Sequence, residues 1–156
     1  MSRITKCDLP AQSLLHSYTQ PGDFVDCYRC DSQLGVDAAA AHAMAFPGWV
    51  DRLLRLRNVV VKPFGLSAAM PQDTTLNKVG HFPIDQRNDN EVILGFDDSH
   101  LNFRISVLVD GTRAHAATWV HRNNALGRIY LAAIMPFHVL IMRNAIGQVA
   151  AASVAE

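Results

Sequence analysis

The chain has 156 residues, of which 49% are hydrophobic and 18% are charged, a composition that indicates one globular domain and excludes a disordered chain. Lys and Arg together number 14, as do Asp and Glu, so the formal net charge is zero and the basic surface of a nucleic-acid-binding protein is not expected. Three cysteines do not make a disulfide framework, which favours a reducing, cytoplasmic location.

Residues 1–21 show no hydrophobic period, and we expect an irregular N-terminal segment followed by a core over residues 22–152, in a single domain 1–156. The segment lacks the apolar stretch of a signal peptide. The longest apolar run, residues 129–142, contains Pro136 and His138 and is shorter than the roughly 20 residues of a membrane-spanning helix. We therefore expect no membrane span.

A strand is predicted over residues 23–30, after the Pro21-Gly22 turn. Cys27 and Cys30 lie on it three residues apart, so their side chains should point to opposite faces of the sheet. They are expected to be two half-buried thiols rather than a zinc or redox pair, since no second cysteine pair completes four ligands.

Two shorter helices are expected after this strand. Asp37 could cap the first, over residues 38–45, and Pro47-Gly48 separates it from the second. The second helix carries apolar residues on one side (Trp49, Leu53, Leu56 and Val60) and ends near Pro63. Residues 67–77 are predicted to form a loop.

An antiparallel meander is predicted over residues 91–97, 101–109 and 112–121, because Asp98-Ser99 and Asp110-Gly111 are turn signals. Two-residue turns place Leu94 opposite Phe103 and Phe103 opposite Thr118. One face is then apolar: Val92, Leu94, Phe96, Leu101, Phe103, Ile105, Val107, Ala114, Ala116, Thr118 and Val120. The opposite face carries Asn102, Arg104, Ser106, Arg113, His115, Trp119 and His121, and we expect it to be solvated or to form an interface. A further strand is expected over residues 81–85.

A long C-terminal helix is predicted from Asn123 and Asn124, either of which can cap it, to about residue 152. Its expected buried stripe repeats at steps of three and four: Leu126, Ile129, Tyr130, Ala133, Ile134, Phe137, Leu140 and Ile141. Pro136 should bend the helix without ending it. The predicted fold is therefore α+β, a curved antiparallel sheet of about five or more strands packed on this helix.

Several segments carry a resemblance to a known family: D-F-V-D (23–26), W-V-D-R-L-L-R-L-R (49–57), K-P-F-G-L (62–66), L-G-F-D-D (94–98), H-L-N-F-R (100–104), N-N-A-L-G-R-I-Y (123–130) and P-F-H (136–138). Across roughly residues 22–146 the chain resembles the DUF2867 family of uncharacterised bacterial proteins. The order of elements resembles the helix-grip fold of the START / Bet v 1 (SRPBCC) superfamily. That resemblance implies either a pocket that binds a hydrophobic ligand or a cyclase activity. The five strands counted here are fewer than that fold usually has.

The first functional hypothesis is a binding module for a small apolar or amphipathic molecule, held between helix and sheet by Tyr28, Phe103, Thr118, Tyr130, Phe137 and His138. A second is a cyclase or isomerase with His138 or Tyr130 as acid or base. For His138 we favour a hydrogen bond to a backbone carbonyl near the bend, with the ligand or catalytic role as the alternative. Asp97, Asp98 and His100 resemble a metal site, but Asp98 is explained as a turn residue, and neither metal nor cofactor is expected.

A third hypothesis is an accessory domain. Relatives that resemble this chain occur beside nucleotide-binding dehydrogenase domains, which implies docking on an oxidoreductase partner. The face of Arg113, His115 and Trp119 would then bind that partner or form a homodimer. These residues identify no ligand, substrate or partner.

Overall fold

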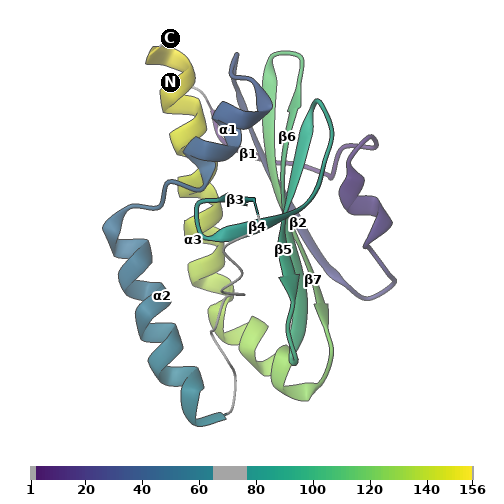
Figure 1. Ribbon diagram of the computed structural model, residues 1–156, viewed down its shortest axis with the longest axis vertical. Coiled ribbons are helices and arrows are strands. Elements are labelled where there is room, and N and C mark those ends of the chain that lie inside the picture. Colours follow the sequence, from purple (N-terminus) through teal and green to yellow (C-terminus); the bar gives the residue numbers. More distant parts are fainter. Residues whose placement is uncertain (1–2, 65–76, 156) are drawn as a thin grey trace.

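A computed structural model describes residues 3–64 and 77–155, and Figure 1 shows how its elements are arranged. In chain order these are β1 (Thr5–Lys6), the short 3-10 helix η1 (Leu14–Ser17), β2 (Phe24–Asp31), α1 (Val36–Ala43), α2 (Gly48–Val61), η2 (Lys62–Phe64), β3 (Lys78–Val79), β4 (Phe82–Arg87), β5 (Glu91–Asp97), β6 (Leu101–Asp110), β7 (Arg113–Arg122) and α3 (Ala125–Ala155). The predicted α+β class and the long C-terminal helix are confirmed. The loop predicted over residues 67–77 falls, apart from Asn77, outside the described residues.

The strands form one antiparallel sheet, which has seven strands in the described part of the chain, in the order β1-β2-β7-β6-β5-β4-β3. About five strands were predicted. The difference lies in β1 and β3, because each has only two residues and shows no alternation that a sequence pattern could reveal.

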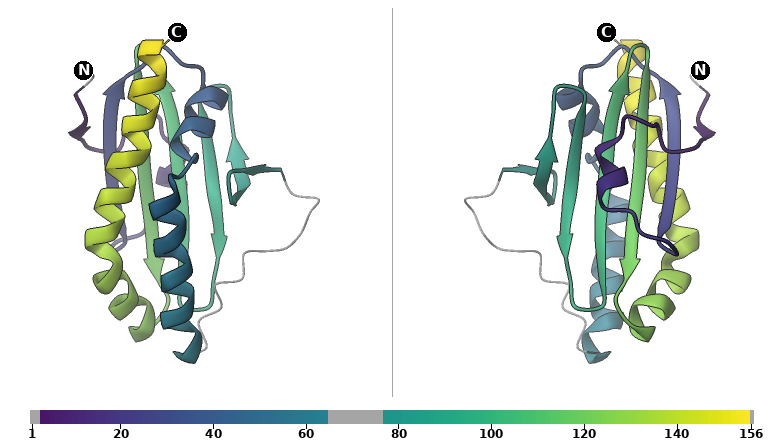
Figure 2. Two further views of the ribbon diagram at one scale, coloured as in Figure 1. Left: turned by 90° about the vertical axis from the view of Figure 1, so that its left-hand side faces the viewer. Right: turned by 90° about the vertical axis from the view of Figure 1, so that its right-hand side faces the viewer.

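The two faces of the sheet have different covers. α1 and α3 pack directly on one face, and α2 stands in front of the same face but further from the strands (Figures 1 and 2). The core between these layers joins Leu94, Val107 and Ala116 of the sheet to Ala39 of α1 and Ile146 of α3. The N-terminal segment with η1 crosses the opposite face.

The meander has the predicted faces but not the predicted pairing. Phe103 lies opposite Phe96 on β5 and opposite Val120 on β7, so both registers differ from the prediction by two residues. The β6–β7 turn is formed by Gly111 and Thr112, because Asp110 already pairs with Arg113. Side chains alternate with a period of two, so a two-residue shift leaves every side chain on its predicted face.

α3 runs without interruption through Pro136, as predicted, and curves along the sheet (Figure 1). Its buried side is not the predicted stripe, since Ile129 is 67% exposed, Leu140 56% and Phe137 48%. The buried residues are Gly127, Leu131, Met142, Ala145, Ile146, Val149 and Ala150. α3 is apolar on more than one side. The side that packs on the sheet is rich in small residues, which let the helix approach the strands closely.

The helix is also longer than the apolar run that was expected to rule out a membrane span. By length and composition α3 could cross a membrane, and only 17% of its most apolar 18-residue stretch is buried. This is weak evidence, because the core helix of a soluble protein meets the same criterion. The contacts of α3 with β2 and β7 give it a packed side in the described chain.

The two shorter helices differ from the prediction in detail. α1 begins at Val36 after Gly35, which makes no side-chain cap, and Asp37 lies in its first turn instead of capping it. On the side of α2 that was expected to be buried, Trp49 is 40% and Leu56 59% exposed, whereas Val50 is fully buried. α2 therefore presents apolar side chains that the described residues leave uncovered.

The face that was expected to be solvated is buried, which corrects the prediction for Arg104, Ser106, His115 and Trp119. The N-terminal segment supplies Leu9, Leu14, Leu15 and Tyr18, which pack around Trp119. The indole N–H donates to Asp23 Oδ2 over 2.8 Å, so Trp119 is satisfied within the chain. Docking or dimerisation through Trp119 would first require the N-terminal segment to leave.

Candidate functional site

A row of four phenylalanine rings crosses the helix side of the sheet. Phe46 lies in the loop after α1, Phe82 on β4, Phe96 on β5 and Phe103 on β6, and each is only partly buried. Neighbouring rings meet edge to face, with centroids 6.3 Å apart for Phe46–Phe82, 5.8 Å for Phe82–Phe103 and 4.9 Å for Phe96–Phe103. We call these four residues the aromatic row. Ordered, partly exposed rings of this kind suit contact with an apolar molecule.

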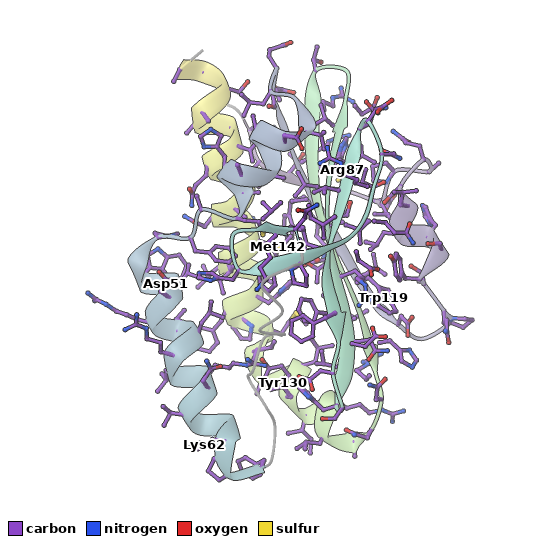
Figure 3. All side chains as sticks on the ribbon, in the orientation of Figure 1. Asp51, Lys62, Arg87, Trp119, Tyr130 and Met142 are labelled. Carbon is purple, nitrogen blue, oxygen red and sulfur yellow. The ribbon has the colours of Figure 1, made fainter. Side chains whose placement is uncertain are left out.

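α2 is anchored on both sides of this row. Near its start, the Asp51 carboxylate lies 3.7 Å from His81 Nε2, in the turn that leads into β4. Near its end, Arg57 Nε donates a hydrogen bond of 2.6 Å to the Tyr130 hydroxyl of α3. The Arg57 guanidinium carbon also lies 5.2 Å from the centre of the Tyr130 ring. α2 is thereby held in front of the sheet face that carries the aromatic row (Figures 2 and 3).

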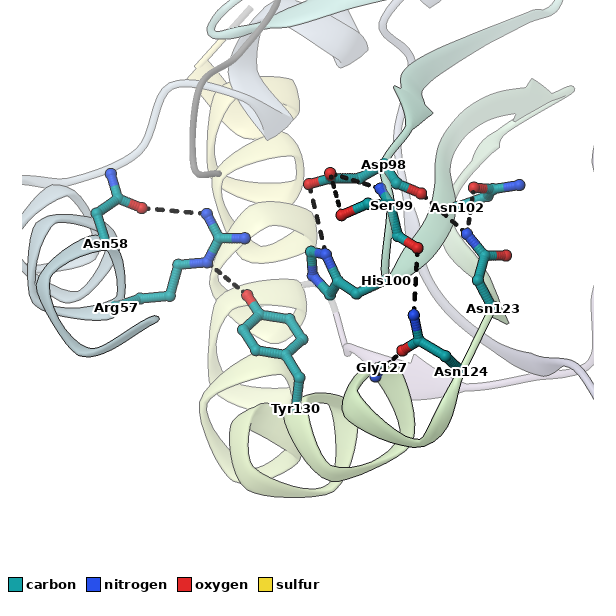
Figure 4. Close-up of polar contacts among 10 residues, drawn as sticks. All are labelled: Arg57, Asn58, Asp98, Ser99, His100, Asn102, Asn123, Asn124, Gly127 and Tyr130. Atoms are coloured by element: carbon teal, nitrogen blue, oxygen red, sulfur yellow. Dashed lines mark hydrogen bonds and ion pairs between the residues drawn. The ribbon is translucent and has the colours of Figure 1, made fainter. Parts of the chain in front are cut away.

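A polar cluster of Arg57, Asp98, His100 and Tyr130 lies where β5, β6 and α3 meet (Figure 4). The rings of His100 and Tyr130 pack edge to face with centroids 5.1 Å apart. His100 Nδ1 lies 3.6 Å from Asp98 Oδ2, which is within ion-pair range but too long for a hydrogen bond. His100 is 1% exposed, and neither ring nitrogen has a hydrogen-bond partner among the described residues.

Backbone contacts hold His100 in this position. The Asn123 N–H donates to the His100 carbonyl over 3.0 Å, and the Asn123 side chain donates to the Asp98 carbonyl over 2.9 Å. Asn124 Oδ1 accepts from the Gly127 N–H at 3.0 Å, which identifies Asn124 as the cap of α3. Gly127 packs against the His100 carbonyl without room for a β-carbon. The start of α3 and the β5–β6 turn are therefore one rigid unit.

Burial lowers the pKa of His100, and the nearby Arg57 charge lowers it further, against an opposing effect from Asp98. The imidazole is therefore neutral at pH 7, with one nitrogen able to donate and the other able to accept a hydrogen bond. The Tyr130 hydroxyl accepts from Arg57, which leaves its own proton free to donate. Together with the guanidinium, these groups are suited to a polar or anionic group near Phe103, which packs with Tyr130 against the same core residues.

The structure brings only some of the sequence-predicted ligand residues together. Phe103 belongs to the aromatic row and Tyr130 to the polar cluster. Phe137 is half exposed on α3. Tyr28 is 3% exposed and lies in the core, and the Thr118 hydroxyl, equally buried, donates to Met142 Sδ over 3.4 Å.

His138 is paired with a carboxylate instead of the backbone carbonyl that was considered for it. Its Nε2 donates to Asp26 Oδ2 over 3.1 Å, between α3 and β2. Asp26 is 5% exposed, and its Oδ1 has no hydrogen-bond partner in the described chain. A carboxylate that orients an imidazole is suited to general acid or base chemistry. The same hydrogen bond also gives the partly buried His138 side chain the partner that a purely structural histidine needs.

No sequence pattern singled out Arg57 or Asp26. Asp98 and His100 were considered only as a metal site, and no cluster of three or more metal-ligating side chains occurs among the described residues. Arg57 lies 73 residues before Tyr130, and no local pattern indicates their contact. Cys27 and Cys30 belong to the cores on opposite faces of the sheet, as predicted, but each is fully buried and not half-buried.

Acidification is expected to destabilise the protein before its carboxylates titrate. Burial lowers the pKa of His100 and of His115, so folding disfavours their protonated forms. The free energy of unfolding should be highest above about pH 6.5 and should fall as the pH drops from there toward the folded-state pKa values. Because the pKa values of Asp23 and Asp85 are lowered, their contribution to the free energy of unfolding is lost only below about pH 4.

Urea unfolding at about pH 7.5 and about pH 5.5 measures this effect. We expect a lower free energy of unfolding at the acidic pH for the natural chain, and a smaller difference for the double variant His100→Gln, His115→Gln. If the free energy of unfolding changed equally between the two pH values in both proteins, the effect could not be assigned to His100 and His115. Because each protein is compared with itself, any loss of stability from the substitutions cancels.

Comparison with known proteins gives one match. A family model described as "Protein of unknown function (DUF2867)" matches residues 19–145, which include Arg57, His100 and Tyr130 but not η1 or β1. No curated protein and no solved structure matches the chain.

Proposed function

The chain belongs to the DUF2867 family, as its sequence segments predicted, and we propose that it binds a small amphipathic molecule on the helix side of its sheet. The apolar part would lie on the aromatic row, under α2, and the polar part would reach Arg57, His100 and Tyr130. The observation that carries the proposal is His100, a buried side chain whose ring packs on Tyr130 and whose two nitrogens have no hydrogen-bond partner among the described residues.

The fold is consistent with this proposal. A long strand, two helices, a run of antiparallel strands and a long final helix follow one another, and β2 pairs with β7 to place the first long strand beside the last. We propose that this is a helix-grip fold, in which ligands bind between the helices and the sheet. A cyclase or isomerase acting at the same surface stays a prediction, as does the cytoplasmic location.

The proposal fits the chemistry of an anionic amphiphile best. An unsatisfied buried imidazole gains a hydrogen bond when a ligand supplies one, and a guanidinium gains an ion pair. Aromatic rings that are already ordered lose little conformational freedom when an apolar group covers them.

The probe 1-anilinonaphthalene-8-sulfonate tests the proposal, because it joins an aromatic body to a sulfonate. For one site we expect a dissociation constant on the order of 10 µM, from about 0.3 kcal/mol per heavy atom. Arg57→Ala and Phe103→Leu should each weaken binding about tenfold, since each removes roughly 1–1.5 kcal/mol of contact. Fluorescence titration and calorimetry give the affinity and the stoichiometry.

Two matched variants serve as controls. Arg55→Ala removes an exposed charge from the same helix, and Val154→Ala removes an apolar side chain, 75% exposed, at the far end of α3. Both should bind the probe like the natural chain. The uncharged analogue N-phenyl-1-naphthylamine should bind the natural chain and Arg57→Ala equally. Binding of the sulfonate that is insensitive to both Arg57→Ala and Phe103→Leu would refute the proposal.

A further inference from the structure

Two thiols face each other on the side of the sheet away from the aromatic row. β1 pairs with β2 so that Lys6 lies opposite Tyr28, and the same register places Cys7 opposite Cys27. The Cys7 N–H donates to the Cys27 carbonyl over 2.9 Å, and the two sulfur atoms are 3.4 Å apart. Cα atoms of such a cross-strand pair are about 5.5 Å apart, which is within the range that a disulfide spans.

The two cysteines differ in access. Cys27 is 2% exposed and packs in the core formed with Leu15 and Trp119. Cys7 is partly exposed and lines a surface cleft of about 540 Å³. A reagent in this cleft would meet Cys7 first, with Cys27 directly behind it.

The cleft has a small excess of positive charge. Its walls include the cationic side chains of Lys6, Arg29 and Arg113, against the carboxylates of Asp8 and Asp110. Gln12 Nε2 donates to Asp110 over 3.0 Å, so part of that carboxylate is already satisfied. His115 also lines the cleft, is 6% exposed, and its Nδ1 has no hydrogen-bond partner among the described residues. An unsatisfied buried nitrogen beside two arginines is suited to a carboxylate-bearing ligand.

We propose that Cys7 and Cys27 form a thiol–disulfide exchange site for a small disulfide that carries carboxylate groups. The Cys7 sulfur attacks the disulfide RSSR, forms a mixed disulfide Cys7–S–SR and releases one RSH. The Cys27 sulfur then attacks Cys7 Sγ, forms the Cys7–Cys27 disulfide and releases the second RSH. The protein loses two electrons and two protons, and RSSR gains both to become two thiols.

Burial, followed by the hydrogen bond with Cys7, raises the pKa of the Cys27 thiol. Cys27 is therefore the resolving thiol and the slower partner, because only the thiolate attacks. The product disulfide would join the N-terminal segment to β2 and close the loop that contains η1. This link goes beyond ligand binding at the aromatic row, which lies on the other face of the sheet.

Incubation of the full reduced chain with glutathione disulfide under anaerobic conditions tests the proposal. Mass spectrometry should show the loss of two hydrogens, and peptide mapping should assign a Cys7–Cys27 link. Cys30→Ser should behave identically, since Cys30 lies in the other core. Cys27→Ser and Cys27→Ala should each trap one glutathione adduct on Cys7. Closure of the loop should raise the melting temperature by roughly 5–10 °C.

A charge test separates the cleft from simple thiol reactivity. Arg113→Ala removes an exposed cation of the cleft and should slow oxidation by glutathione disulfide about threefold to tenfold. It should leave the rate with the uncharged 2-hydroxyethyl disulfide unchanged. No Cys7–Cys27 link in the natural chain, an adduct at Cys30 in its place, or equal rates for Arg113→Ala with glutathione disulfide would each overturn the proposal.

Discussion

Replacing Gly127 with alanine is expected to destabilise the protein by about 3 kcal/mol or more, although alanine is the better helix former. A β-carbon at position 127 would lie 2.0 Å from the His100 carbonyl oxygen and 3.0 Å from its carbon. Both are backbone atoms, so no side chain can rotate away. Either the first turn of α3 or the β5–β6 turn must move, and the Asn123–His100 hydrogen bond would be strained.

Thermal and urea unfolding measure the effect, and the melting temperature should fall by roughly 6–12 °C. Gly147→Ala is the matched control on the same helix, because its β-carbon would meet only the end of the Ile4 side chain, at 3.3 Å. The gain in helix propensity should offset that contact and leave stability within about 1 kcal/mol of the natural chain. Equal stability of the two variants would show that α3 does not pack on His100 as described.

Replacing Glu91 with alanine is expected to cost about 3–4 kcal/mol, because its carboxylate organises a buried network. Glu91 is 1% exposed and begins β5. It accepts hydrogen bonds from the Ser13 hydroxyl and the Leu14 N–H, both at 2.6 Å, and from the Ser106 hydroxyl at 2.5 Å. Alanine would leave these donors unsatisfied and would release η1 from the sheet.

Glu91→Gln should cost less, about 1–2 kcal/mol, since the amide keeps one acceptor oxygen. Asp37→Ala is the control, because its carboxylate is 78% exposed and paired only at the surface with Arg87. It should change stability by no more than about 0.5 kcal/mol. Amide hydrogen exchange should show loss of protection around η1 in Glu91→Ala alone. Unchanged protection there would mean that the carboxylate does not hold the N-terminal segment.

The sequence correctly predicted the sheet face of each strand residue in the meander, but not which residues pair across neighbouring strands. The alternation over residues 91–121 correctly placed Phe103 and Ala116 on the helix side and Ser106 on the other. The same alternation could not choose between registers two residues apart, because both bury the same side chains. The loops decided the register, and Asp98 and Asp110 were each compatible with more than one turn.

The residues of the candidate site were likewise predicted only in part. Phe103 and Tyr130 were predicted as ligand residues, since an aromatic side chain facing the core is visible in the pattern. Arg57 and His100 were not, because their role depends on the distance between α2, α3 and the β5–β6 turn. A charged residue on an amphipathic helix is ordinarily solvated, and only its neighbour in space shows otherwise.

By itself, the sequence determined the α+β class, the position of the long final helix and the face of each meander residue, because these depend on the local periods of two and 3.6. Tertiary structure alone decided which side of α3 is buried, since Ile129, Phe137 and Leu140 are as apolar as the residues that pack. It also decided that the N-terminal segment covers Trp119, since contacts between residues far apart in the chain have no local period.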